Sequence, residues 1–142
     1  MQSKIKFKRI VNWLGSTEMF ARPSKKLPGK WILFEFYHEP DKKLIHKTKD
    51  QIKKERIVWE IEFDAQENYT HNTNLDIPVV SKITSGTWSR SKNFITLIHP
   101  VNFRDNVEFQ FAIEKENLKL LKKDALGKIE FFGFFRKETK NN

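Results

Sequence analysis

The sequence predicts an all-β protein: an eight-stranded antiparallel up-and-down β-barrel, with an amphipathic helix before it. From residue 30 onward, eight short segments alternate apolar and polar residues, as strands with one buried face do. Most connections after residue 56 are short, as antiparallel hairpins require. A closed barrel also removes the exposed edges of an open sheet. A two-sheet β-sandwich is the alternative, because counting strands does not separate the two folds.

The first expected element is a helix over residues 2–14. Its apolar face would consist of Phe7, Ile10, Val11 and Leu14, which follow helical spacing. Its opposite, basic face would include Lys4, Lys8 and Arg9. We expect three parts: a basic helical leader over residues 1–28 that packs on the barrel, the barrel itself over 29–138, and a disordered tail over 139–142.

The expected strands span residues 30–37, 56–64, 67–75, 81–90, 93–99, 106–115, 117–123 and 127–137. The pattern is clearest over 106–115, where Val107, Phe109 and Phe111 share one face. The connection over residues 38–55 is long and rich in lysine, so we expect it to be exposed, with a helical part between Leu44 and Ile52.

The first and last expected strands are apolar on both faces. In the first, Trp31 and Leu33 share one face, and the other carries Ile32, Phe34 and Phe36. In the last, Ile129, Phe131 and Phe135 share one face, and the other carries Phe132 and Phe134. These strands are neighbours in a closed meander, so the outside of their seam needs a cover. The leading helix is the expected cover, worth on the order of 6–10 kcal/mol before entropy; a partner protein or a membrane is the alternative.

The positive charge is concentrated near the start of the chain. The net charge is +9, and residues 1–30 carry +7 of it. The rest of the chain is nearly balanced, which argues against a nucleic-acid-binding fold. The basic leader is either a solvated helix face or a segment attracted to an anionic membrane or an acidic partner.

The composition also limits compartment and chemistry. The 142 residues include no cysteine, which excludes disulfides and thiolate metal sites. No apolar run approaches the ~18–20 residues of a membrane span, and no signal peptide is evident. We therefore expect a cytoplasmic protein, or a periplasmic or exported one if a segment precedes Met1.

Few residues suggest catalysis. The four histidines lie on separate segments without metal-ligand spacing, and no nucleophile or nucleotide-binding motif occurs. Alternation places Glu35 on the face of Trp31, near the barrel mouth. We expect no cofactor, no metal and no enzymatic activity, and an enzyme is the remaining alternative.

Gly29-x-Trp31, at the start of the first strand, resembles the G-x-W motif of lipocalins and other calycins. The order of short helix, G-x-W, long first loop and seven further strands also matches. The segment over residues 86–97 resembles small bacterial lipocalin-like domains, and cytosolic fatty-acid-binding proteins are similar too. The resemblance implies that a basic residue late in the last strand, here Arg136, packs across Trp31.

The expected function is a lipocalin-like binding protein that holds a small apolar ligand inside the barrel. The interior would be lined by Trp31, Leu33, Trp59, Phe63, Phe109 and Phe111. A plain packed core of the same residues is the alternative, because an eight-stranded barrel can be filled by its own side chains. The alternative function is an accessory or adaptor subunit that uses the barrel exterior and the basic helix.

Overall fold

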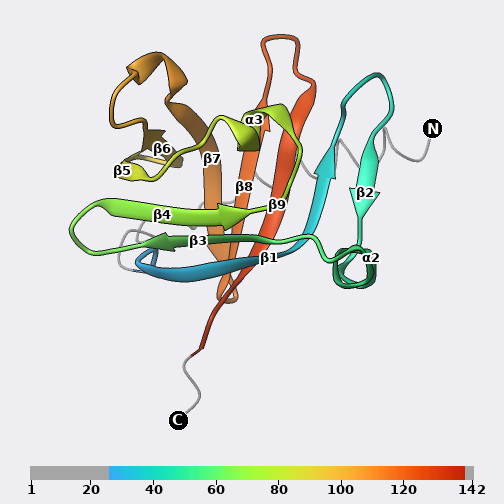
Figure 1. Ribbon diagram of the computed structural model, residues 1–142, viewed down its shortest axis with the longest axis horizontal. Helices are drawn as coiled ribbons and strands as arrows, with labels where there is room; N and C mark the ends of the chain where they lie inside the picture. Colours follow the sequence, from blue (N-terminus) through green and yellow to red (C-terminus); the bar gives the residue numbers. More distant parts are fainter. Residues whose placement is uncertain (1–25, 140–142) are drawn as a thin grey trace.

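A computed structural model of the protein describes residues 26–139 (Figure 1). Its strands are β1 (Gly29–His38), β2 (Ile45–Lys47), β3 (Trp59–Phe63), β4 (Asn68–Thr73), β5 (Gly86–Ser91), β6 (Phe94–Ile98), β7 (Val107–Glu114), β8 (Asn117–Lys123) and β9 (Ile129–Lys137). Its helices are α2 (Lys49–Glu55), α3 (Pro78–Ser81) and the 3-10 helix η3 (Phe103–Asp105). The predicted leader before residue 26, and residues 140–142 of the predicted tail, lie outside the described residues.

The sheet closes on itself. β1 pairs antiparallel with β3 on one side and with β9 on the other, so the first and last strands meet. β1 and β3–β9 thus form the predicted eight-stranded antiparallel barrel, which excludes the β-sandwich. The short β2 was not predicted; it pairs with the second half of β1, beyond the end of β3.

The seam between β4 and β5 is short and is reinforced by the connection between them. Only two residue pairs join these strands. The connection carries α3, whose Val79 and Val80 belong to the main core. The Tyr69 hydroxyl of β4 donates a hydrogen bond to the Thr84 carbonyl. The prediction of a strand from residue 81 was therefore wrong at its start, because Pro78 has the fixed φ that favours the first turn of a helix.

The long first connection is partly ordered, as predicted. Thr48 caps α2 through a capping box with Gln51, and Ile52 is buried in the core. The helix covers residues 49–55, which places it later in the chain than the expected Leu44–Ile52 segment.

A bulge in β1 changes which residues face inward. The register with β9 shifts between Leu33 and Glu35, so the alternation changes phase there. Phe36 therefore lies in the core, 2% exposed, and not on the outer face as predicted. Glu35 correspondingly leaves the face of Trp31, and its Oε2 lies 2.6 Å from His46 Nε2 on β2.

The barrel interior is occupied by the protein's own rings. The six predicted interior residues all belong to one core cluster, and none is more than 3% exposed. Trp59 is central: its ring centroid lies 5.1 Å from that of Phe131, 5.3 Å from Phe135 and 6.4 Å from Phe109. These tilted and edge-to-face contacts are favourable aromatic geometries.

A second apolar cluster lies on the outer face of β1, β7, β8 and β9. Its buried members are Tyr37, Ala112, Leu121, Ile129 and Phe132. Leu44 and Phe134 pack against it. Ile129 was predicted to share the face of Phe131, and a register shift near Lys123 explains the difference. Whether the apolar face of the leader covers this outer cluster stays a prediction, because Phe7, Ile10, Val11 and Leu14 lie outside the described residues.

His71 lies within hydrogen-bonding distance of both a core residue and the β4–β5 connection. The Trp59 indole donates to its Nδ1 over 3.1 Å, and its Nε2 lies 2.8 Å from the Ile83 carbonyl. These partners require neutral His71 with its proton on Nε2, because protonated Nδ1 would face another donor. Burial lowers the pKa of His71 below its ordinary value of 6.5.

This pKa shift predicts an acid-sensitive fold. Below about pH 6.5 the unfolded chain binds a proton at His71 that the folded chain does not. The free energy of unfolding therefore decreases as the pH is lowered. The part of the free energy of unfolding that depends on neutral His71 is complete above that pH. It is lost as the pH falls to the lowered pKa of His71 in the folded state. We expect urea unfolding to show this loss, and His71→Gln to reduce it, because glutamine can keep both hydrogen bonds without titrating. An unchanged pH dependence in the variant would contradict the assignment.

Candidate functional site

The Gly-x-Trp segment forms one end of the barrel. Trp31 is 1% exposed, and its indole donates a hydrogen bond to the Leu27 carbonyl over 2.8 Å. Gly29 has φ of 137°, and a Cβ at this position would lie 2.6 Å from Lys137 Cε. Glycine is therefore favoured at residue 29 by its backbone conformation, whereas the end of the flexible Lys137 side chain could move aside for a Cβ.

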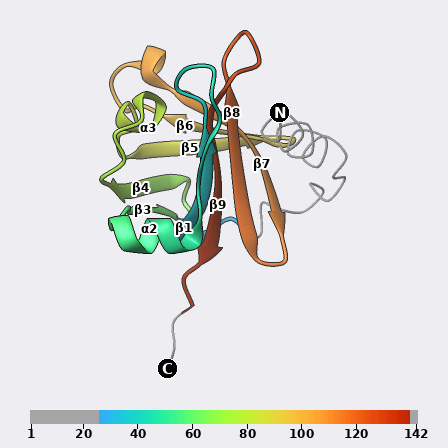
Figure 2. The ribbon, with the colours of Figure 1, turned by 90° about the vertical axis from the view of Figure 1, so that its right-hand side faces the viewer.

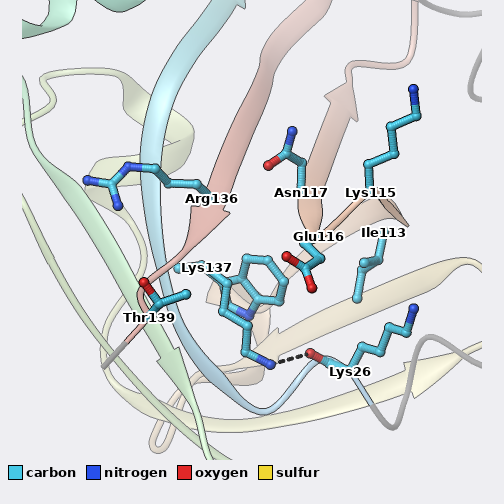
Figure 3. A pocket seen from close by; sticks show the side chains of 9 residues that line it. Lys26, Ile113, Lys115, Glu116, Asn117, Arg136, Lys137 and Thr139 are labelled. Atoms are coloured by element: carbon cyan, nitrogen blue, oxygen red, sulfur yellow. Dashed lines mark hydrogen bonds between the residues drawn. The ribbon is translucent and has the colours of Figure 1, made fainter. Parts of the chain in front are cut away.

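The basic residue over Trp31 is Lys137. Its Nζ lies 5.4 Å from the centroid of the indole ring and donates to the Lys26 carbonyl over 3.1 Å. Figure 3 shows Lys137 extending toward Lys26 while Arg136 points away from both. The prediction of Arg136 was wrong because Trp31 pairs with Lys137 and Arg136 pairs with Ile32, and successive residues of a strand face opposite sides.

Two matched substitutions test this correction. Lys137→Met should lower the free energy of unfolding by about 0.5–2 kcal/mol, because it removes the cation–π contact and the hydrogen bond to Lys26. Arg136→Met should change it by less than about 0.5 kcal/mol, as exposed positions usually do. Urea unfolding of both variants measures the difference, and the opposite order would restore the original assignment.

A hollow of about 340 Å³ opens beside Trp31 and is called the cationic hollow below. Three segments converge on it: the residue that leads into β1, the β7–β8 turn and the end of β9 (Figure 3). Its lining residues are Lys26, Trp31, Ile113, Lys115, Glu116, Asn117, Arg136, Lys137 and Thr139.

The lining of the cationic hollow is electrostatically unbalanced. It contains four cationic side chains and a single carboxylate, that of Glu116. None of the ion pairs within residues 26–139 involves Lys26, Lys115 or Arg136. Cations gathered without carboxylate partners repel one another, so a negatively charged group in the hollow would be favoured.

The β7–β8 turn holds part of this lining in a costly conformation. Lys115 and Glu116 have φ of 50° and 66°, as the central residues of a type I′ turn do. Each non-glycine residue in the left-handed region costs about 1–2 kcal/mol. The tight turn places both side chains at the edge of the cationic hollow, next to the paired residues Asn117 and Arg136.

The lining of the cationic hollow presents groups that can bind an anion. Arginine and lysine donate charge-assisted hydrogen bonds to carboxylates and phosphates, and the planar Arg136 guanidinium can do so with two parallel bonds. Trp31 and Ile113 supply apolar surface beside these cations. In the described part of the chain, no group of three or more histidine or acidic residues is placed to hold a metal ion.

The predicted site residues are divided between the core and the cationic hollow. Of the six predicted interior residues, only Trp31 also lines the cationic hollow, and the other five lie in the core. The predicted signature residues Gly29 and Arg136 do lie at this end of the barrel. Sequence reasoning missed Lys26, Lys115 and Lys137, and the turn signal at residues 115–117 was the one available hint.

No family model, curated protein or solved structure matches this chain. The closed eight-stranded barrel is compatible with a lipocalin-like fold, and the function is argued below from the geometry of the site. Across residues 26–139, no helix combines the length and apolar character needed to cross a membrane.

Proposed function

We propose that this protein is a non-enzymatic binding protein whose ligand is a small amphipathic anion held in the cationic hollow. The ligand would carry a carboxylate or phosphate group on an apolar chain or ring. The observation that supports this proposal is the hollow beside Trp31, whose lining includes four cationic residues and one carboxylate.

The two halves of the ligand follow from the two kinds of lining. The anionic group would lie at the cationic part of the lining. Lys115 and Arg136 line the hollow from different sides, and neither takes part in an ion pair among the described residues. The apolar part would lie against Ile113 and the edge of Trp31. A hollow of about 340 Å³ has the size of a small-molecule site, near the lower end of the usual range.

This proposal keeps the lipocalin-like role but places the ligand at the end of the barrel. A ligand in the interior would have to displace rings that are in contact around Trp59. Such displacement costs packing energy, because protein cores are close-packed. The interior site therefore stays a prediction, and the cationic hollow is the better supported location.

Isothermal titration calorimetry with decanoate tests the proposal. We expect the double variant Lys115→Gln/Arg136→Gln to bind decanoate at least about tenfold more weakly, because charge-assisted hydrogen bonds contribute about 1.5–3 kcal/mol. Lys42→Gln/Lys43→Gln removes the same charge far from the hollow and should bind as the unsubstituted protein does. Equal decanoate affinity in all three proteins, or equal affinity for decanol and decanoate, would contradict the proposal.

A second candidate function, an accessory subunit, is favoured by the outer apolar cluster. Phe34 and Phe134 are only half-buried there, with ring centroids 6.4 Å apart. A protein partner would cover these rings if the leader does not. Native mass spectrometry of gently purified complexes should then show a co-purifying protein with the unsubstituted chain. The double variant Phe34→Ser/Phe134→Ser should lose this partner. A partner retained by both the unsubstituted protein and the variant would contradict this role.

A further inference from the structure

Glu116 supplies the one carboxylate in the lining of the cationic hollow. Four cationic residues line the same hollow, yet Glu116 takes part in none of the ion pairs within residues 26–139. Its carboxylate also accepts no hydrogen bond from another residue of this described part of the chain. The hollow therefore presents positive and negative groups that are not neutralised against each other.

The β7–β8 turn determines where this carboxylate lies. Glu114 and Asn117 pair across the hairpin, so Lys115 and Glu116 are the two residues of its loop. Figures 1 and 2 show this turn beside the end of β9. Glycine would adopt the φ of 66° at residue 116 with less strain, so the backbone gives no reason for a glutamate there. Figure 3 shows Lys115 and Arg136 extending away from the Glu116 carboxylate on different sides.

An ionised carboxylate only accepts hydrogen bonds. A ligand group placed beside Glu116 therefore has to be a donor, and a protonated amine is the most favourable one, because its hydrogen bond is charge-assisted. A ligand that carries only anionic groups would be repelled at this point of the lining. The hollow thus combines three chemistries: cations, one carboxylate, and the apolar surface of Trp31 and Ile113.

We infer that the ligand of the cationic hollow is an amino acid with a large apolar side chain. Its carboxylate would lie among the cations, its ammonium group beside Glu116, and its side chain against Ile113 and Trp31. A single carbon atom of an amino acid carries all three groups, so one small molecule can contact three kinds of lining within about 340 Å³. This inference rests on the proposed function and adds Glu116 as the residue that determines which amphipathic anions bind most tightly.

Calorimetric titration with decanoate and with 2-aminodecanoate tests the inference, because the two ligands differ only in the amine. At neutral pH, where the amine is protonated, we expect the unsubstituted protein to bind 2-aminodecanoate about fivefold or more tightly than decanoate. We expect Glu116→Gln to lose this preference, because the cations of the hollow then repel the ammonium group with no carboxylate to offset them. The ratio of the two affinities is compared within each protein, so a general change in stability cancels.

Glu67→Gln is the matched control for Glu116→Gln. Glu67 is also an exposed turn residue in the left-handed conformation, with φ of 67°, and it does not line the hollow. We expect this variant to keep the preference of the unsubstituted protein. An equal preference in Glu116→Gln and the unsubstituted protein would overturn the inference. Tighter binding of decanoate than of 2-aminodecanoate by the unsubstituted protein would overturn it as well.

The two ligands also distinguish a failure of this inference from a failure of the proposed function. If decanoate binds and Lys115→Gln/Arg136→Gln weakens its binding, while the amine brings no gain, the anion site stands and the role of Glu116 is wrong. If neither ligand binds, the proposed function fails and this inference fails with it.

Discussion

Replacing Trp59 with alanine is expected to lower the free energy of unfolding by about 3–5 kcal/mol, the range for large aromatic side chains in cores. Trp59 is fully buried and contacts the rings of Phe109, Phe131 and Phe135. Its removal would leave a cavity at the centre of the barrel and would also deprive His71 of its indole donor. Urea unfolding at neutral pH measures the effect.

Phe94→Ala is the matched control for Trp59→Ala. Phe94 is also an aromatic residue on a strand, but it is 38% exposed. We expect its replacement to cost about 1 kcal/mol or less, because an exposed ring gains little from burial. If Trp59→Ala were as mild as Phe94→Ala, the interior would not be the close-packed core that the structure describes.

The double substitution Ile10→Asp/Leu14→Asp is expected to destabilise the protein by about 2–4 kcal/mol net. Each side chain buried against the outer cluster would contribute about 1.5–3 kcal/mol, and ordering of the helix offsets part of this. The prediction rests on two observations: the apolar face formed by Phe7, Ile10, Val11 and Leu14 in the sequence, and the cluster around Phe132 on the outer face of the barrel.

The opposite face of the same predicted helix supplies the control. Lys4→Gln/Lys8→Gln/Arg9→Gln changes charge without changing the apolar face, so stability should stay within about 0.5 kcal/mol. Thermal unfolding of the two multiple variants compares the faces. If the aspartate variant kept full stability, the leader would not cover the outer cluster, and a partner or a membrane would take its place.

The architecture was predictable where strands alternate without interruption. Phe109 and Phe111 were assigned to the interior, with Val107 on the same face of the strand, and the structure places all three in the core. The meeting of the first and last strands was also predicted, because these strands are neighbours in a closed meander. These inferences needed only the two-residue period of a strand and short connections.

The failures arise where the period is broken. The bulge after Leu33 moves Phe36 inward and Glu35 outward, and no residue type in this stretch signals it. The choice between Arg136 and Lys137 depends on a register that only the paired strands define. A shift of one residue reverses every assignment of a strand to a face.

The cationic hollow could not have been located from the sequence alone. Lys26, Lys115 and Lys137 are far apart in the chain, and only closure of the barrel brings them together. Isolated lysines are normal at protein surfaces, so their number in a sequence does not reveal where they converge. The exposure of Phe103 and Leu126 could not be predicted from the sequence either, because an apolar residue in a loop can be buried or exposed.

The central claim is that the interior is filled by the protein's own rings and that binding occurs at the cationic hollow. A nitrogen-15 NMR titration with decanoate, which follows the tryptophan indole N–H signals, tests it most directly. Trp31 borders the hollow and Trp59 lies in the core, and Trp→Phe variants assign the two signals. We predict that the Trp31 signal shifts on titration while the Trp59 signal stays in place. A large shift of Trp59 with Trp31 unchanged would place the ligand inside the barrel and contradict the account.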